Sequence, residues 1–240
     1  MTRGYSVTQT RRDFPFAGSV YLTRSYAFVG APAAPGESPL PSQTGIPANS
    51  FHLVSEESAG YAQLGSTTGI GSINGAQHFV YRPVQTLSVA SKFELGDPVN
   101  PVSRVTTTQN VGDFDTFGFV KKSTVSALDG SSTLTESAYW HETTGKWLLG
   151  RLAASRVTKN YGGASTTKTS AFAYRSSDGL LVKEVVEPKD LPDGFADGTA
   201  PSGYNPVAAL PSEITAPHGG HPGGVEKTYS LDNFGNTTAA

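Results

Sequence analysis

The sequence predicts an all-β fold in which antiparallel β-hairpins stack side by side, and three observations support this prediction. The chain of 240 residues is 37% hydrophobic and only 16% charged, yet it holds 27 Gly and 16 Pro, as expected of short strands joined by turns. Apolar residues mostly alternate with polar ones instead of recurring at the helical period. A short turn sequence, Asp-x-Phe-Gly, occurs twice, each time between polar and β-branched runs.

The repeated turn predicts three hairpins. One copy begins at Asp115 and another at Asp232, and a looser copy follows the run that ends in Tyr174. Asp can accept a hydrogen bond from the backbone two residues on, and Gly supplies the positive φ that a tight reversal needs. A lone hairpin is marginal in water, so such units are expected to stack. The expected structural turn residues are Asp115, Gly118, Asp178, Gly179, Asp232 and Gly235.

Residues 1–29 are predicted to form two or three N-terminal strands with a turn over residues 14–18. Residues 30–50 are rich in Pro and Ala and predict an irregular loop or linker.

Residues 51–186 form the predicted central β region. Its Gly-, Ser- and Thr-rich stretch over residues 60–75 predicts a loop. A helical turn competes with a strand over residues 146–158, and the β-branched end of that segment favours a strand. The other expected strands cover residues 51–54, 78–81, 86–95 and 131–140.

The C-terminal part holds the second irregular region. Residues 187–224 are rich in Pro and Gly and predict a long loop or insertion, since connections of that length are uncommon in compact domains. Residues 225–240 are expected to form a final, truncated hairpin.

Charge and composition exclude several classes of function. The net charge is −2 with no basic stripe, which argues against nucleic acid as the main partner. The absence of Cys excludes disulfides and thiolate metal sites. Residues 1–7 lack the apolar core of a signal peptide, and no apolar run approaches the roughly 18 residues of a membrane span.

Short stretches that resemble metal-binding motifs are incomplete. His141-Glu142 begins like the zinc-protease pattern His-Glu-x-x-His, but Gly145 stands where the second His is required. This pair is expected at a polar hairpin tip.

Two further clusters are interpreted as non-functional. His218 and His221 lie in a Gly-rich stretch and are expected to be solvated. Asp113 and Asp115 lack the ligand series of a calcium loop and are expected to be turn carboxylates. The sequence therefore predicts no catalytic residue, no cofactor and no metal.

Three aromatic residues, Tyr139, Trp140 and Trp147, could face a ligand. Core packing is the favoured interpretation because aromatic side chains carry a large apolar area. An alternative is a free-standing β-sandwich that binds carbohydrate or a partner protein through Trp140 or Trp147. A hydrolase that uses Glu142 is a third hypothesis.

With these hairpins, the segment Trp147-Leu148-Leu149-Gly150-Arg151-Leu152 resembles the RHS/YD-repeat family. The chain is similar to Rhs-like cores of bacterial secreted toxins of the insecticidal-toxin-complex and virulence-plasmid type. In those cores a Trp-Leu-Leu-Gly-Arg-Leu segment precedes a Tyr-Asp-x-x-Gly hairpin and an acidic-Pro exit, here Glu187-Pro188. The resemblance covers residues 109–188 and 226–238 best, and residues 9–18 are also similar.

The chain departs from the family pattern at several positions. Phe114 and Leu231 stand where the family prefers Tyr before Asp. The middle copy keeps Tyr174 but has one extra residue before Gly179. The self-cleavage signature Asp-Pro-x-Gly-Leu is not found, nor is a segment that resembles a C-terminal toxin domain.

The resemblance implies a structural, non-enzymatic role. The family forms a long β-sheet that spirals into a shell around a toxic C-terminal domain, and this chain would supply one segment of that sheet. The implied partners are the remaining RHS-repeat sheet and the enclosed toxin domain. The implied location is outside the cell or on its surface, as part of a larger polypeptide.

Overall fold

The structure of the protein is a computed structural model. It describes residues 4–28, 51–65, 68–73, 76–95, 97–143, 147–175, 178–186, 225–232 and 236–239. The predicted irregular regions, residues 30–50 and 187–224, lie outside these residues. His218, His221 and the predicted turn residue Gly235 also lie outside them.

The all-β prediction is confirmed. Within the described residues the regular elements are antiparallel strands, apart from a single 3-10 turn, η2 (Val111–Asp113). None of the helical structure in this part of the chain has the length and hydropathy that a membrane crossing requires.

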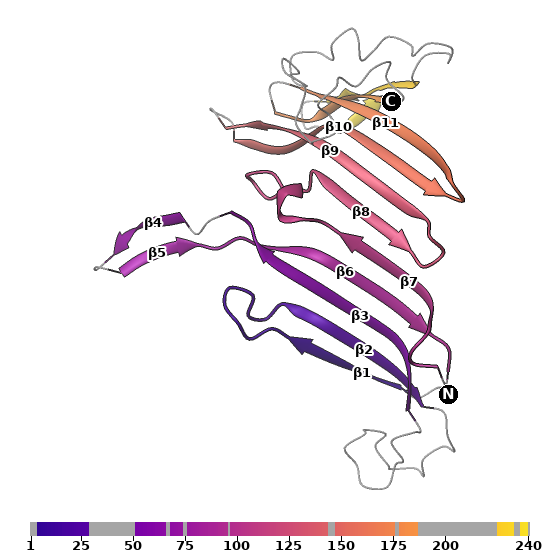
Figure 1. The fold of residues 1–240 in the computed structure, drawn as a ribbon. Coiled ribbons are helices and arrows are strands. Elements are labelled where there is room, and N and C mark those ends of the chain that lie inside the picture. Colours follow the sequence, from indigo (N-terminus) through magenta and orange to yellow (C-terminus); the bar gives the residue numbers. More distant parts are fainter. Residues whose placement is uncertain are drawn as a thin grey trace. The chain divides into compact units, whose positions relative to one another are not determined.

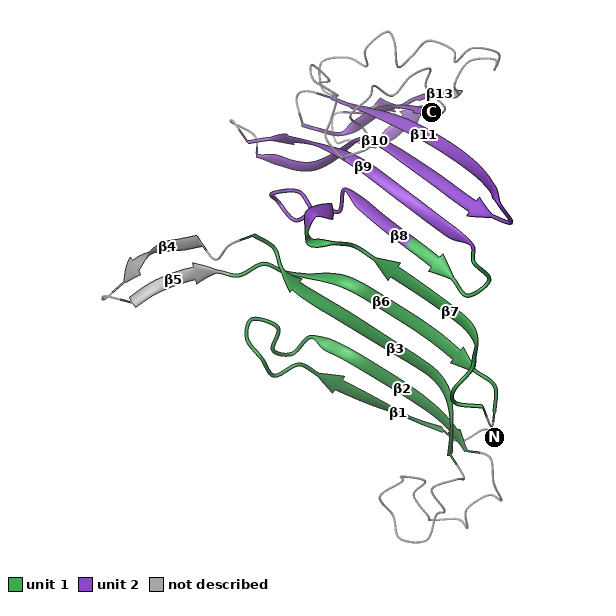
Figure 2. Ribbon diagram, viewed as in Figure 1, with its two compact units in different colours: residues 1–111, 125–130 green, residues 112–124, 131–240 purple. Residues whose placement is uncertain are grey.

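The chain divides into two compact units, which are coloured separately in Figure 2. Unit 1 comprises residues 1–111 and 125–130. Unit 2 comprises residues 112–124 and 131–240. Strand β8 (Lys122–Ala127) contributes residues to both.

Unit 1 contains an antiparallel sheet in the order β1-β2-β3-β6-β7, in which strands adjacent in the sheet follow one another in the chain except for the β4–β5 excursion (Figure 1). Strands β4 and β5 pair only with each other. The strands are β1 (Gly4–Thr10), β2 (Val20–Phe28), β3 (Phe51–Gln63), β4 (Thr68–Ile73), β5 (Ala76–Val80), β6 (Pro83–Phe93) and β7 (Pro101–Thr108).

The sheet of unit 1 is stabilised by cross-strand pairs more than by a core. Tyr5 lies opposite Tyr26, and their rings stack with centroids 4.8 Å apart. The Phe51 ring meets Tyr5 edge-on at 5.0 Å. Among the described residues of this unit, only Leu64 and Ser91 are buried. Most of its stability must therefore come from ladder hydrogen bonds and half-buried side-chain pairs.

Unit 2 contains an antiparallel sheet in the order β9-β10-β11-β12-β13. A separate short ladder joins β14 and β15. The strands are β9 (Ser132–Glu142), β10 (Leu148–Tyr161), β11 (Ala164–Tyr174), β12 (Leu181–Val186), β13 (Val225–Thr228), β14 (Ser230–Leu231) and β15 (Thr237–Ala239).

A row of small side chains crosses four strands of unit 2. Ala138, Ala154, Ala171 and Val185 lie directly opposite one another from β9 to β12. All four are at most 2% exposed. Together with Ala153, this row holds the most deeply buried side chains of the described chain.

The predicted loop over residues 60–75 is wrong. Strand β3 continues to Gln63, and β4 occupies Thr68–Ile73. The predicted short strand at residues 51–54 is only the start of the 13-residue β3. Pairing with β6 holds the Gly-containing end of β3 in the sheet, and such tertiary pairing overrides the turn preference of Gly and Ser.

Two of the three predicted hairpins are paired ladders. Strands β11 and β12 pair around the looser copy of the turn, where Arg175 N–H donates to the Leu180 carbonyl at 2.8 Å. Strands β14 and β15 pair around Asp232.

The prediction of flanking strands around Asp115 is wrong for the residues before the turn, whereas the run after the turn continues into β8. Only one bridge, between Phe114 and Val120, joins the two sides of this turn. The preceding residues form η2 instead of a strand. The two backbone bonds of this bridge run from Lys121 N–H to the Asp113 carbonyl at 2.6 Å and from Asp115 N–H to the Phe119 carbonyl at 2.9 Å.

Candidate functional site

The best-defined polar cluster of unit 2 is built on the turn that begins at Asp115. Its Oδ1 accepts hydrogen bonds from the backbone N–H groups of Phe117 at 2.8 Å and Phe119 at 2.9 Å. Gly118 donates its N–H to the Asp115 carbonyl at 3.1 Å and has a φ of +94°. The side chain of Asp115 thus organises the turn, and Gly118 has the backbone conformation that favours glycine.

The second carboxylate oxygen of Asp115 contacts His141, which lies 26 residues further along the chain. His141 Nε2 lies 2.8 Å from Asp115 Oδ2. The Gly150 N–H donates to His141 Nδ1 at 3.0 Å. Because Nδ1 accepts, Nε2 carries the proton and donates it to Asp115. The imidazole therefore links the Asp115 turn to β9 and β10.

This bonding leaves His141 without a free ring nitrogen for catalysis or metal binding. A general base needs an available lone pair, and here the lone pair on Nδ1 already accepts from Gly150. Across the part of the chain that the structure describes, no group of three His, Cys, Asp or Glu side chains could hold a metal ion.

His141 lies at the end of β9, beside the connection to β10, as the hairpin-tip prediction expects, but its side chain does not face solvent. Its side chain is only 16% exposed, and that of Asp115 is 13% exposed. Sequence reasoning missed the pair because its members lie 26 positions apart and no local signal connects them; only the folding of β9 beside the turn brings them together.

Aromatic rings surround the imidazole. The Phe117 and His141 ring centroids lie 4.5 Å apart, and those of Phe119 and Tyr139 lie 5.3 Å apart. Phe119 also contacts His141 at 5.6 Å. Tyr139, one of the three aromatics predicted from sequence, is therefore part of a packed aromatic group. Phe117 is its most exposed member at 37%.

The two tryptophans have different surroundings. Trp140 packs against the buried cluster of Ala153, Ala171, Ala173 and Val185. Trp147 is 64% exposed and has a φ of +52°, which is uncommon for a residue other than glycine. Of the two, Trp147 is the one whose ring is accessible to a ligand.

Gly150 lies at an irregularity in the pairing of β10 with β9, and the packing of Phe119 requires a residue without a side chain there. The register of β10 against β9 shifts between Leu148 and Arg151. Gly150 has a φ of +70°, and a Cβ there would overlap the Phe119 ring. This close approach also positions the Gly150 N–H for its bond to His141.

The segment from Trp147 to Leu152 packs against the turn that contains Asp178 and Gly179. Gly179 is buried with a φ of +71°, and a Cβ there would lie 2.8 Å from Leu148 Cδ1 and 3.0 Å from Arg151 Nε. The Arg151 guanidinium carbon lies 5.8 Å from the centre of the Tyr174 ring. The Trp147–Leu152 segment and the turn at Gly179, the two stretches from which the family resemblance was inferred, are thus in contact.

Tyr174 adds a hydrogen bond to this contact. Its hydroxyl donates to the Leu152 carbonyl at 2.8 Å. Burial raises the pKa of the Tyr174 hydroxyl above its ordinary value, whereas the positive charge of Arg151 acts in the opposite direction.

The other two Asp residues of the predicted turns also bond to the backbone near them. Asp178 Oδ1 accepts from Leu180 N–H at 3.1 Å, and its carboxylate pairs with Arg175. Asp232 Oδ1 accepts from Asn236 N–H at 2.8 Å.

Comparison of the chain with protein-family models, with curated proteins and with solved structures finds no match. The role of the site is therefore inferred from its own residues.

Proposed function

We propose that this chain is a structural, non-enzymatic β-sheet segment of an RHS-repeat-type secreted toxin or cell-surface protein. In this role it contributes to a shell that encloses a C-terminal toxin domain of the same or a neighbouring polypeptide. Its partners are then the remaining repeat sheet and that enclosed domain.

The observation that carries the proposal is the contact between the Trp147–Leu152 segment and the Gly179 turn. Leu148 and Arg151 lie so close to Gly179 that a Cβ there would force their side chains to shift. In a shell built of repeats, each hairpin packs against its neighbour. The contact at Gly179 supports such packing, and it involves the residues on which the resemblance to RHS repeats rests.

The bonding of the polar cluster supports a structural role over a catalytic one. Asp115 uses both carboxylate oxygens, and His141 uses both ring nitrogens, for bonds within unit 2. Groups that are held in this way stabilise a turn, whereas a catalytic dyad must keep one nitrogen for its substrate.

The sparse core of unit 1 supports a place within a larger sheet. Leu95, Val99 and Val102 are 60%, 77% and 57% exposed. In a shell, neighbouring segments would cover them.

The size of the native polypeptide tests this proposal. An immunoblot of the source cells, with antiserum raised against this chain, is expected to show a band several times larger than 25.1 kDa. The recombinant chain on the same gel provides the size standard. A native band at 25.1 kDa would contradict the proposal, because no shell segment would then be attached.

The exposure of Trp147 favours a second candidate, a module that binds neutral carbohydrate by stacking. Its ring is 64% exposed and its backbone is held at a φ of +52°. Residues held in an unfavourable backbone conformation are concentrated at functional sites. A glycan titration should then change the tryptophan fluorescence of the protein but not that of Trp147→Phe. A flat response across a broad glycan panel would remove this candidate.

A further inference from the structure

A small hollow in unit 1 has a largely apolar wall. It has a volume of about 290 Å³ and is lined by residues of β2, of β3 and of the turn between β6 and β7. Its apolar lining consists of Tyr26, Phe51, Leu53 and Pro98. Small-molecule sites span about 300–1,000 Å³, so a hollow of this size suits a few side chains of a peptide better than a complete drug-sized ligand.

The aromatic rings of this wall are held in place by other rings. Tyr26 stacks on Tyr5, with ring centroids 4.8 Å apart. Phe51 meets Tyr5 edge-on at 5.0 Å and packs against Phe28 at 5.3 Å. The rings are therefore ordered by contacts within unit 1, and a ligand that binds to them does not have to supply the free energy of ordering them.

The turn that supplies Pro98 is also fixed. Asp97 Oδ1 accepts hydrogen bonds from the backbone N–H groups of Asn100 at 3.0 Å and Val99 at 3.1 Å, and Asp97 Oδ2 accepts from Asn100 Nδ2 at 3.0 Å. The bonds from Asn100 and Val99 hold the pKa of the Asp97 carboxyl below its ordinary value, so the carboxylate that organises the turn is charged at neutral pH. Val99, next to Pro98, is 77% exposed and extends the apolar surface beside the hollow.

The polar side chains of the lining can donate hydrogen bonds. Arg24 Nε donates to Glu56 Oε2 at 2.6 Å, and the guanidinium has further N–H groups. The Tyr26 hydroxyl and the His52 ring can each donate one hydrogen bond. A proline-rich segment has the complementary chemistry, because each proline has a carbonyl acceptor but no N–H, and its ring packs on aromatic side chains.

We propose that this hollow binds a proline-rich segment of another polypeptide in the polyproline II conformation. This conformation has no internal hydrogen bonds, so its carbonyl groups are available to the donors of Arg24, Tyr26 and His52. It is also largely formed before binding, so little conformational entropy is lost when it docks on rings that are already ordered. The site lies entirely in unit 1 and does not depend on the role proposed for the whole chain.

Calorimetric titration of the full chain with capped decaproline tests the proposal. The matched probe is decaproline built from D-residues, which has the same composition and hydrophobicity but the opposite helical hand. A capped decapeptide of alternating alanine and glutamine is the third probe, because it has the same length without proline rings. Decaproline is expected to bind, and the other two peptides are expected to bind at least about tenfold more weakly.

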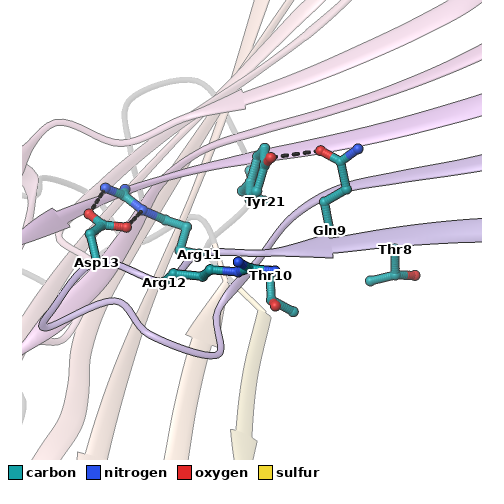
Figure 3. Close-up of a pocket in the computed structure, with 8 residues that line it drawn as sticks. Thr8, Gln9, Thr10, Arg11, Arg12, Asp13 and Tyr21 are labelled. Carbon is teal, nitrogen blue, oxygen red and sulfur yellow. Dashed lines mark hydrogen bonds and ion pairs between the residues drawn. The ribbon is translucent and has the colours of Figure 1, made fainter.

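Substitutions then locate the site. Tyr26→Leu keeps apolar volume but removes the ring and its hydroxyl, and should weaken decaproline binding about tenfold or more. Pro98→Ala alters the wall in the turn, outside the strand pairs, and should weaken binding about fivefold. Tyr21→Leu is the matched control in the same strand, because Tyr21 lines a different hollow, at the end of β1 (Figure 3), and should leave the affinity unchanged. Circular dichroism of each variant establishes that it is folded.

Several results would overturn the proposal. Absence of decaproline binding would reject the ligand class. Equal binding of the D-peptide would reject recognition of the polyproline II helix, and equal binding of the alanine–glutamine peptide would reject recognition of proline. Unchanged binding by folded Pro98→Ala and Tyr26→Leu would place any binding elsewhere on the protein. A higher affinity after replacement of the four prolines of residues 31–41 by alanine would assign the hollow to the chain's own segment instead of another polypeptide.

Discussion

Each unit carries an Arg–Glu pair between directly opposite residues of neighbouring strands, but the two pairs have different surroundings. Arg24 Nε lies 2.6 Å from Glu56 Oε2, and these side chains are 43% and 30% exposed. Arg156 Nε lies 2.7 Å from Glu136 Oε2, and these are 29% and 6% exposed. The contacts are nearly identical. Burial, not contact distance, therefore decides how much the loss of each pair would cost.

The burial of apolar side chains also differs between the two units. Unit 2 contains the buried row from Ala138 to Val185, whereas unit 1 relies on half-buried rings such as Tyr5 and Tyr26. Unit 2 should thus tolerate changes of volume or charge less well than unit 1, and matched substitutions in the two units test this difference. Trp140 and Trp147, the two tryptophans of the chain, both lie in unit 2, so their fluorescence follows its unfolding.

The largest difference in the loss of stability is expected between Gly150→Ala in unit 2 and Gly18→Ala in unit 1. Both glycines have positive φ, +70° and +88°. A Cβ at Gly150 would overlap Phe119, whereas nothing lies within 4 Å of one at Gly18. Gly150→Ala should lower the free energy of unfolding by about 3–5 kcal/mol, from backbone strain and overpacking together, and Gly18→Ala by about 1 kcal/mol.

Urea denaturation, followed by fluorescence for unit 2 and by circular dichroism for the whole chain, measures both glycine variants. Equal losses of stability would show that the contact between Phe119 and Gly150 does not constrain the fold.

The second largest difference in the loss of stability is expected between Arg156→Ala in unit 2 and Arg24→Ala in unit 1. Removing Arg156 leaves the Glu136 carboxylate, only 6% exposed, without its partner, which should cost about 3 kcal/mol. Removing Arg24 leaves Glu56 in contact with water and should cost about 0.5 kcal/mol. Denaturation midpoints of the two variants at the same pH and salt concentration provide the measurement. A larger loss for Arg24→Ala would contradict the comparison.

The smallest effect concerns the hydroxyl of Tyr174. Tyr174→Phe removes its bond to the Leu152 carbonyl and should cost about 1 kcal/mol at pH 7. Burial raises the pKa of Tyr174 in the folded state, so its contribution is present below the unfolded pKa of about 10 and is lost as the pH rises through the folded value. The stability gap between wild type and variant should therefore narrow above pH 10.

Denaturation midpoints at pH 7, 9 and 10.5 measure this gap. Tyr161→Phe, at a residue that is 70% exposed, is the control and should show no gap at pH 7. A gap for Tyr174→Phe that stayed constant with pH would contradict the prediction.

The local sequence was sufficient for much of the secondary structure. The strands predicted over residues 131–140 and 146–158 are present as β9 and β10, with β10 beginning at Leu148. The hairpin between β11 and β12 was also expected. These predictions depend on alternation and on turn chemistry, which act between residues close in the chain. The resemblance to RHS repeats stays a prediction.

Local preference was misleading where the backbone had a non-local partner. The residues after Gly60 favour a loop by composition, yet β6 pairs with the end of β3 and keeps it extended. Conversely, the residues before Asp115 alternate like a strand but form η2, and pairing across the Asp115 turn is limited to the bridge between Phe114 and Val120.

By itself, the sequence determined the all-β class and the turn chemistry of Asp115 and Asp178, because alternation and Asx bonding are local. Only the tertiary structure decided that His141 bonds to Asp115 and that Gly150 must lack a side chain beside Phe119. These contacts join separate stretches of the chain, and their positions are set by strand register and by the irregularity in β10. Register depends on all the pairs of a ladder at once, so no single stretch of sequence specifies it.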